Sequence, residues 1–337
     1  MLRSIWLVLA LLTLTVLVPL PAKAQNRSRY FPETGFIVDG AVLSAFNRYG
    51  GVPIIGLPIS DAMETICEQS SCTVQWFERT RIEIHHDDGK AYRGRIGADF
   101  LAQRGTPWQF GTDDVQQHAD EAPCLAFGKT GHVTCNVFLA AWKRYGATER
   151  LGLPITGVQD ETYVDSGTGQ TVTFRTQWLE RAALEDHGEQ GVLLRLLGSQ
   201  TYPAWAEHLQ ADLINAQRVK SGLPPLAWHD GLAQAARSHS QDLAQHNGRG
   251  HIGTDGRDPI ARTSNLGLSG FFGGEVVTYD QSPVAAFRSW MQSPPHREIL
   301  LYPNTALLGV GYGVVLGPVR GNQWPATVWT ADFWVTR

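Results

Sequence analysis

The sequence has no excess of basic residues and only one long apolar run. Its 337 residues include 28 Lys and Arg against 32 Asp and Glu, a net charge of −4. Proteins that bind nucleic acid or anionic membrane surfaces usually carry a basic patch, because phosphate neutralisation drives that binding. The charge balance therefore argues against nucleic acid as a partner. With 43% hydrophobic residues, the chain can form two or three domains with cores.

The one long apolar run lies at the N-terminus, from Ile5 to Leu20. Arg3 precedes it and the small-residue end Ala22-Lys23-Ala24 follows, which is the pattern of a cleaved export signal. We expect residues 1–24 to be a signal peptide, and the protein to be secreted, extracellular or associated with the cell envelope, with no membrane span after signal removal. The run is nearly long enough to cross a bilayer, so an uncleaved anchor stays open as the alternative.

Cysteine is scarce, with only four residues in two close pairs. In an exported protein this pattern predicts two local disulfides, Cys67 with Cys72 and Cys124 with Cys135. A zinc site would need all four thiolates to converge, and neither pair has the two-residue spacing of a zinc knuckle. We therefore expect each disulfide to close one loop.

Two segments of the chain resemble each other. "ETGFIVDGAVLSAFNRYGGVPIIGLPIS" begins at Glu33 and matches "KTGHVTCNVFLAAWKRYGATERLGLPIT" from Lys129, and "VQWFERTRIEIH" later matches "RTQWLERAALEDH". Such repetition predicts two copies of one unit, at residues 25–104 and 121–200, each a short helix on a small sheet. The Gly-Leu-Pro-Ile turns resemble the LGFP-type repeats of secreted bacterial proteins, which implies attachment to a cell wall.

Aromatic and charged residues recur in both units. The aromatic residues either stack on a glycan or fill small cores, and we favour the core interpretation. They are Trp76, Phe77, Trp142 and Trp178. Glu78-Arg79 and Glu180-Arg181 occupy the same position in each unit, and this repetition favours structural ion pairs over the paired carboxylates of a glycosidase.

The pattern changes after residue 200. Helical spacing begins at Ala204 and ends at Ser221-Gly222, and a second amphipathic helix begins near Leu232. Ser282 is the predicted cap of a third helix that starts with Pro283. "ALLGVGYGVV" and "ATVWTADFWV" have the composition of strands. The order of elements predicts an α+β domain.

Several motifs stand in a fixed order in this part of the chain. They are Asn215 with Arg218, "LAWHDGLAQAARSHSQDLA", "GHIGTDGRDPIAR", "GGEVV", "SWMQSPPHREIL" and "GVGYG". Through them, residues 203–337 resemble the CAP superfamily of cysteine-rich secretory, antigen 5 and pathogenesis-related 1 proteins, above all its bacterial SCP-like branch. The resemblance implies an α-β-α sandwich, preceded here by the two small α+β repeat units.

The resemblance also implies a cleft lined by His251, Glu275 and His296. His251 and His296 are candidate ligands for Zn²⁺ or another divalent cation, and Glu275 would complete the shell or orient a bound water. The alternative is a hydrogen-bonded cluster without metal. His239, on the second helix, is expected to be a structural histidine. Departures from the family pattern reduce the polarity of the cleft: Val276, Glu298 with Ile299, and Ser293.

Three functions remain open from the sequence. Family members are mostly binding or signalling modules, several of which bind sterols or other lipids, so the resemblance implies a non-catalytic module for a ligand or partner at the cell envelope. Cell-wall glycan and a lipid or sterol-like ligand are the candidate partners. One alternative is a divalent-metal-dependent hydrolase of peptide or cell-wall polymer, with Glu275 as the candidate catalytic base. The other is a structural adhesin.

Overall fold

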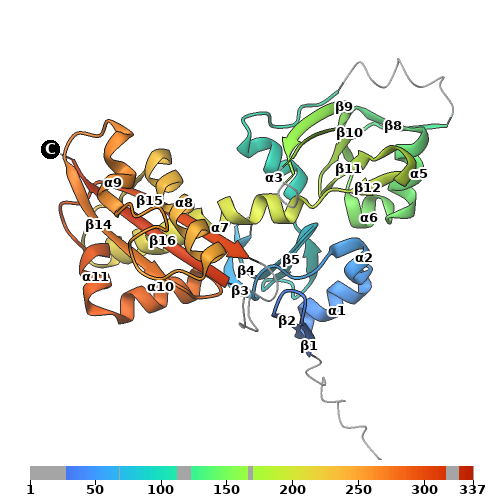
Figure 1. Cartoon of the computed structure of the whole chain (residues 1–337). Coiled ribbons are helices and arrows are strands. Elements are labelled where there is room, and N and C mark those ends of the chain that lie inside the picture. Colours follow the sequence, from blue (N-terminus) through green and yellow to red (C-terminus); the bar gives the residue numbers. More distant parts are fainter. Residues whose placement is uncertain (1–27, 68, 112–122, 166–169, 316–325, 337) are drawn as a thin grey trace, which may run out of the picture.

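A computed structural model describes residues 28–67, 69–111, 123–165, 170–315 and 326–336. The predicted signal peptide and most of the polar stretch "QQHADEAPC" lie outside these ranges. The described residues form two small N-terminal units and a larger C-terminal part, with one long helix, α7, between them (Figure 1). None of the helices in these ranges has the length and apolar character needed to cross a membrane.

The first unit contains a hairpin, two short helices and a four-stranded antiparallel sheet. The hairpin and helices are β1 (Ser28–Phe31), β2 (Phe36–Asp39), α1 (Gly40–Arg48) and α2 (Gly51–Ile55). The sheet has the order β3-β4-β5-β6, with strands Met63–Cys67, Ser70–Phe77, Thr80–His85 and Ala91–Arg93. Helix α3 (Ile96–Gln103) follows the sheet.

The second unit has the same order of elements. Its hairpin and helices are β7 (Cys124–Phe127), β8 (His132–Cys135), α5 (Asn136–Arg144) and α6 (Ala147–Leu151). The sheet has the order β12-β11-β10-β9, and its strands in chain order are Pro154–Val164, Thr171–Leu179, Ala182–Asp186 and Val192–Leu194. A 3-10 turn, Gly188–Gln190, precedes the last strand, and α7 (Leu197–Lys220) follows it.

Contacts within the two units correspond. The Tyr49 hydroxyl donates to the Ala91 carbonyl at 2.7 Å, and the Tyr145 hydroxyl donates to the Val192 carbonyl at 3.2 Å. Each tyrosine thus joins the end of the first helix to the last strand of its own sheet, as expected of two copies of one unit. Both predicted disulfides are present and each closes a hairpin, as the spacing indicated.

The recurring aromatic residues are core residues, which confirms the favoured interpretation. Their exposed fractions are 0% for Trp76, 0% for Phe77, 6% for Trp142 and 0% for Trp178, so these rings have no free face for a glycan. Glu78 and Glu180 have corresponding structural roles. The carboxylate of Glu78 accepts a hydrogen bond from the Leu57 amide at 2.9 Å, and that of Glu180 accepts one from the Leu153 amide at 3.0 Å.

The helix that follows each unit in the chain makes backbone hydrogen bonds to the other unit. The amides of Gly97 and Ala98, at the start of α3, both donate to the Glu180 carbonyl at 3.2 Å. In return, the Ser199 amide, at the start of α7, donates to the Glu78 carbonyl at 3.1 Å. Any other residue at position 97 would place its Cβ only 2.0 Å from the Leu179 carbonyl oxygen. Glycine is therefore needed for α3 to lie this close to the second unit.

Helix α7 contacts the first unit at its N-terminal end and packs in the core of the C-terminal part. On α7, the Trp205 ring lies 5.1 Å from the Trp76 ring of the first unit, centroid to centroid. The helix begins at Leu197 rather than near Ala204, because buried contacts continue it N-terminal to Pro203. Residues 200 and 203, the predicted limits of unit 2 and of the last domain, therefore lie inside one helix. The domain division stays a prediction.

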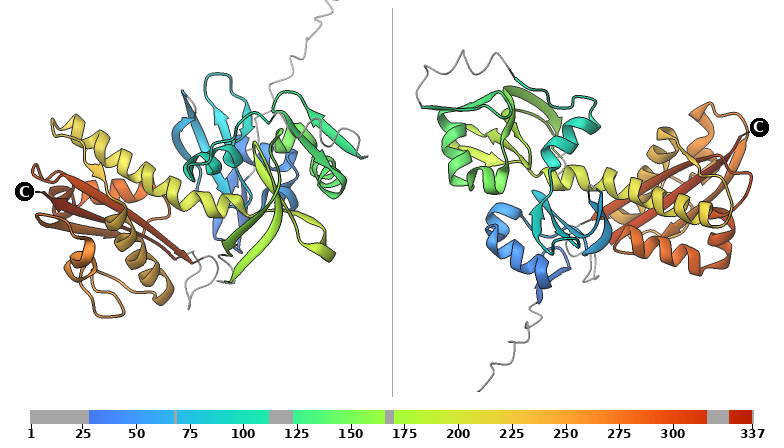
Figure 2. Two further views of the ribbon diagram at one scale, coloured as in Figure 1. Left: turned by 90° about the horizontal axis from the view of Figure 1, so that it is seen from above. Right: turned by 180° about the vertical axis from the view of Figure 1, so that it is seen from behind.

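The C-terminal part is a sheet covered by helices on both faces (Figures 1 and 2). The strand order is β13-β15-β16-β14, formed in chain order by Ala227–Trp228, Phe271–Thr278, Leu307–Val315 and Ala326–Val335. The helices are α8 (Asp230–His246), α9 (Pro259–Thr263), α10 (Pro283–Gln292) and α11 (Pro294–Leu300), with a 3-10 turn at Ser264–Leu266. Ser282 caps α10 by accepting from the Ala285 amide, as predicted.

The two faces of β15 differ. Leu308, Val310 and Tyr312 face the main core, together with residues of α7, α10 and α11. The alternate positions are Gly309, Gly311 and Gly313, and an added Cβ at each would lie 2.1, 2.0 and 2.3 Å from backbone atoms of α8. The backbone of α8 therefore lies directly on the strand. This α-β-α arrangement is the one that the resemblance to the CAP superfamily implied.

The close approach of α8 predicts a selective effect of Gly311→Ala. Because the new Cβ would meet the Arg237 amide nitrogen at 2.0 Å, α8 must move, and we expect a loss of about 3 kcal/mol in the free energy of unfolding. Denaturant titration measures this loss. Gly128→Ala is the matched control, since an added Cβ there meets no atom within 4 Å. Equal stability of the two variants would contradict the packing described here.

Candidate functional site

The three side chains predicted to line the cleft come from three different elements. His251 lies in the loop between α8 and α9, Glu275 lies on β14, and His296 lies on α11. The structure joins His251 directly to Glu275, with 2.7 Å between Nδ1 and Oε1.

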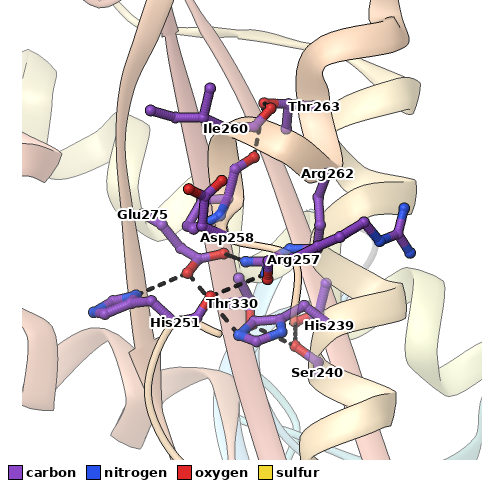
Figure 3. A network of polar contacts seen from close by, with 12 residues as sticks. His239, Ser240, His251, Arg257, Asp258, Ile260, Arg262, Thr263, Glu275 and Thr330 are labelled. Atoms are coloured by element: carbon purple, nitrogen blue, oxygen red, sulfur yellow. Dashed lines mark hydrogen bonds and ion pairs between the residues drawn. The ribbon is translucent and has the colours of Figure 1, made fainter. Parts of the chain in front are cut away.

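The Glu275 carboxylate is buried, with 5% of the residue exposed, and both its oxygens are engaged (Figure 3). Oε1 contacts His251, and Oε2 accepts from Nη2 of Arg262 in a buried ion pair. The Nε2 atom of His239 lies 4.0 Å from Oε1. An ionised carboxylate only accepts hydrogen bonds, so the His251 contact places a proton on Nδ1, and in the neutral ring Nε2 then has the free lone pair.

Arg262 holds the loop around Glu275. Its side chain is 5% exposed, and Nη1 donates to the carbonyls of His251 and Arg257, both at 2.9 Å. The arginine is positioned by α9, a short helix whose N-cap Asp258 accepts from the Ala261 amide at 2.7 Å. Sequence reasoning gave Arg262 no role, although it ends the "GHIGTDGRDPIAR" motif. The signal in the sequence was a basic residue, Arg262, in the same ordered set of motifs as the acidic residue Glu275.

Helix α8 fixes the other side of the loop. The buried His239 imidazole lies 3.0 Å from the Gly250 carbonyl through Nε2, the structural role expected for it. The Asp242 carboxylate accepts from the Thr254 amide at 2.8 Å. The neighbouring Ser240 hydroxyl donates to the Gly311 carbonyl at 3.0 Å and lies 2.8 Å from the Thr330 hydroxyl. The position of His251 thus depends on how α8 packs on the sheet.

A second buried carboxyl, Asp332, was missed from the sequence. It is fully buried on β16 and is paired with Glu275 across the β14–β16 ladder. No donor group of the described residues reaches its oxygens, so a hydrogen bond between the two carboxyls requires Asp332 to donate its own proton to Glu275. Burial, together with the neighbouring Glu275 charge, raises the pKa of Asp332 well above its usual range. The raised pKa favours a protonated, uncharged Asp332 beside Glu275.

His296 differs from the other two residues because its imidazole makes no hydrogen bond to any residue that the structure describes. Burial lowers the pKa of His296, and protonation of His251 would lower it further. The ring is consequently neutral near pH 7 and able to act as a ligand. The position of α11 is fixed from the far end by Arg218, whose Nη1 donates to the carbonyls of Leu300 and Tyr302.

The structure does not gather His251, Glu275 and His296 into a convergent set of three cation ligands. Within the described ranges, three metal-capable side chains converge only at Cys67, Glu83 and His85, and Cys67 is in a disulfide. At the predicted site, the nitrogens of His251 and His296 that make no hydrogen bond remain as candidate ligands. Glu275 orients His251 from behind, as carboxylates commonly do for metal-binding histidines. Val276 is fully buried in the core and adds nothing polar.

Comparison with known proteins identifies the C-terminal part. The model of the CAP family, described as the cysteine-rich secretory protein family, matches residues 211–333. These residues form a CAP domain. The match includes His251, Glu275, His296 and Arg262, and starts within α7, so the CAP domain contains every residue of the site described above.

Two curated relatives each match about a third of the chain. They are the uncharacterized protein YkwD of Bacillus subtilis, 35% identical over 102 residues, and the uncharacterized membrane protein YlbC of the same organism, 33% identical over 101 residues. The match spans 30% of this chain in both cases, and 40% and 29% of the relatives, so it covers less than half of either. A crystal structure of an extracellular SCP-domain protein from Bacillus anthracis aligns with 88% of this chain and 93% of that chain, at 15% identity and a TM-score of 0.35.

The buried carboxyl pair predicts a pH-dependent effect of Asp332→Asn. A raised pKa in the folded state means that the stability associated with Asp332 is complete below its ordinary pKa and is lost as pH rises towards the folded value. Asparagine does not ionise, so the Asp332→Asn variant does not lose this stability as pH rises. Relative to the unchanged protein, Asp332→Asn should therefore gain up to about 1.4 kcal/mol per pH unit above pH 4 within that window. Urea unfolding at pH 4.5 and pH 8 measures the difference, and a gain that is independent of pH would contradict the assignment.

Proposed function

We propose that this chain is a non-catalytic CAP-domain protein that acts outside the cell or at the cell envelope, where the CAP domain binds a ligand or partner. His251 and His296 would hold a divalent cation such as Zn²⁺ at this site. The export-signal pattern of the first 24 residues and the two closed disulfides support this location. A bound cation would attract an oxygen atom of the ligand.

The proposal rests on Glu275, because both oxygens of its carboxylate are already in contact with other side chains. A general base must offer a lone pair to a water or substrate proton within hydrogen-bonding reach. Glu275 is 5% exposed, and its two oxygens already contact His251 and Arg262. The carboxylate is therefore placed to orient an imidazole rather than to activate water. This argues against the hydrolase alternative, in which Glu275 is the base.

Zinc binding tests the proposal directly. Calorimetry on the full chain should detect one Zn²⁺ site near neutral pH, and His251→Ala or His296→Ala should abolish it. The affinity should fall as pH decreases, because only neutral imidazole is a ligand. Since the pKa of His296 is lowered, this nitrogen remains available at pH values where an ordinary histidine is half protonated.

His246→Ala is the matched control, because His246 is 56% exposed and belongs to α8 outside the site. Glu275→Gln should weaken the Zn²⁺ affinity by about 10- to 100-fold through loss of histidine orientation. A melting curve must first show that this variant is folded. The proposal is wrong if Zn²⁺ binds equally to the His251 and His296 variants, or if the protein hydrolyses a peptide or wall-polymer substrate in a Glu275-dependent way.

A further inference from the structure

The first N-terminal unit contains a group of metal-capable side chains that lies outside the CAP domain. Cys67, Glu83 and His85 each place one possible ligand atom within 4.8 Å of the other two. Cys67 is the last residue of β3, and the other two lie on β5. Within the part of the chain that the structure describes, no other three such side chains lie this close together.

The disulfide brings a second sulfur to this group. Cys67 is bonded to Cys72, and Cys72 is paired with His85 across the β4–β5 ladder. Directly opposed residues of two strands point to the same face of a sheet, as do residues two apart on one strand. Cys72, Glu83 and His85 therefore share one face. A zinc site here needs only one of the two cysteine pairs, because β5 supplies the remaining ligands.

The spacing of Glu83 and His85 suits two ligands of one ion. Nε2 of His85 lies 3.1 Å from Oε2 of Glu83. With bonds of about 2.0–2.2 Å in tetrahedral geometry, the nitrogen and oxygen ligands of one Zn²⁺ are roughly 3.3 Å apart. The ion takes the place of the proton between these two atoms. The other oxygen, Oε1, accepts from Nε of Arg81, and ligating carboxylates usually have such support.

Reduction gives the sulfur of Cys67 the freedom that the site requires. In a tetrahedral zinc site, a sulfur ligand lies roughly 3.6 Å from a nitrogen or oxygen ligand. Since the Cys67 sulfur lies within 4.8 Å of the other two ligand atoms, it has to approach them by at most about 1.2 Å. A thiolate is the form of cysteine that ligates a metal, so the disulfide has to be broken first.

The ligands are shielded from water but can be reached from a cavity. Cys67 is 6% exposed, Cys72 is 0% exposed and Glu83 is 5% exposed. The His85 side chain is 14% exposed and borders a cavity of about 730 Å³, where its ring packs against Tyr92 with centroids 4.8 Å apart. An ion therefore enters from the His85 side.

The charges of this group match those of a divalent ion. Two thiolates balance the two positive charges of Zn²⁺, and Glu83 is already paired with Arg81. Asp99, the other carboxylate in contact with Arg81, is 38% exposed, so solvent screens its charge. The ion thus adds no unbalanced charge to the buried face of the sheet.

The second unit provides an internal comparison, because its "QWLER" matches the "QWFER" of the first. Counting from these motifs, the second unit repeats the acid and the histidine as Glu185 and His187, with 3.4 Å between Oε2 and Nε2. Phe174 stands at the position of Cys72, and its ring stacks on His187 with centroids 4.0 Å apart. The carboxylate–imidazole pair therefore recurs with an aromatic ring beside it, where the first unit has a sulfur.

We propose that the first unit binds one Zn²⁺ whenever the Cys67–Cys72 disulfide is reduced. An external dithiol supplies two electrons and two protons, is left as its own disulfide, and converts the bonded cysteines into two thiols. Zn²⁺ then displaces both thiol protons into solvent and is held by the two sulfurs, Oε2 of Glu83 and Nε2 of His85. The ion links β3, β4 and β5, whereas the disulfide links only the first two. The same site exists before the disulfide forms.

Zinc calorimetry on the reduced full chain tests the proposal. The protein is reduced with dithiothreitol, freed of reductant under nitrogen and titrated with Zn²⁺ beside the oxidised protein. We expect the reduced chain to bind one more Zn²⁺ than the oxidised chain and to release two protons with it, as measured in buffers of different ionisation enthalpy. Because the additional ion is counted from the oxidised chain, this result does not depend on whether the CAP site binds Zn²⁺.

The two cysteine pairs separate the site from general thiol binding. The double variant Cys67→Ser/Cys72→Ser should lose the additional ion, whereas Cys124→Ser/Cys135→Ser should keep it. Mg²⁺ should not bind in place of Zn²⁺, because sulfur ligands do not suit a hard cation.

Variants on β5 test the other two ligands. His85→Ala and Glu83→Gln should each weaken binding of the additional Zn²⁺ at least about tenfold. His85→Ala keeps the proposal testable if the buried Glu83 variant does not fold, since His85 lies at the border of the cavity. His187→Ala is the matched control in the second unit and should leave the affinity unchanged.

Four results would overturn the proposal. If reduction adds no Zn²⁺ site, the Cys67–Cys72 bond is a structural disulfide only. Retention of the additional ion in Cys67→Ser/Cys72→Ser, or equal affinity in His85→Ala and the unchanged chain, would rule out the ligands named here. Loss of the fold on reduction that Zn²⁺ does not restore would count equally against it. Failure of Zn²⁺ to bind the oxidised chain concerns the CAP site alone.

Discussion

The CAP domain depends on one buried negative charge, that of Glu275. A buried carboxylate is stable only if it is paired and hydrogen-bonded, since its desolvation is costly. Arg262 supplies the positive charge that pairs with Glu275, and His251 donates a hydrogen bond to it. Both residues lie in the segment between α8 and β14. Asp332 stays neutral beside them because burial raises its pKa. The carboxylate thus determines where the loop lies, which tautomer His251 adopts and why the acid is unavailable as a base.

A packing constraint places this charge cluster. The glycines of β15 allow the backbone of α8 to lie on the sheet, and α8 then presents His239 and Asp242 to the loop. On the other face, Arg218 of α7 holds the end of α11 and hence His296. The same α7 reaches the first unit through Trp205 and Ser199. The two-histidine site and the N-terminal units are therefore connected by one continuous helix.

Much of this fold follows from local sequence signals. The helix from Leu232, the Ser282 cap and the two closing strands were all predicted, because hydrophobic periodicity and capping residues act locally. The disulfides were predicted because the two cysteines of each pair lie close together in the sequence. The start of α7 was not, since Pro203 resembles a helix start and only tertiary contacts with the first unit extend the helix to Leu197.

The site was predicted only in part. Motif order located His251, Glu275 and His296, but it could not show that Glu275 is saturated, because Arg262 and Asp332 reach it from other elements. The cavity lined by Tyr163, Phe174 and Arg195 in the second unit was not predicted either. Glu185 and His187 have the same spacing as Glu83 and His85, and only the strand register shows that aromatic residues replace a disulfide beside them.

The central claim is that Glu275 orients His251 and leaves its Nε2 free for a ligand. Nitrogen-15 NMR of the histidine rings at pH 8 tests it most directly, because protonated and unprotonated ring nitrogens have separate chemical shifts. The account predicts that His251 has its proton on Nδ1, and that Glu275→Gln changes the tautomer balance of this ring but not that of the exposed His246. A proton on Nε2 of His251 in the unchanged protein would contradict the account.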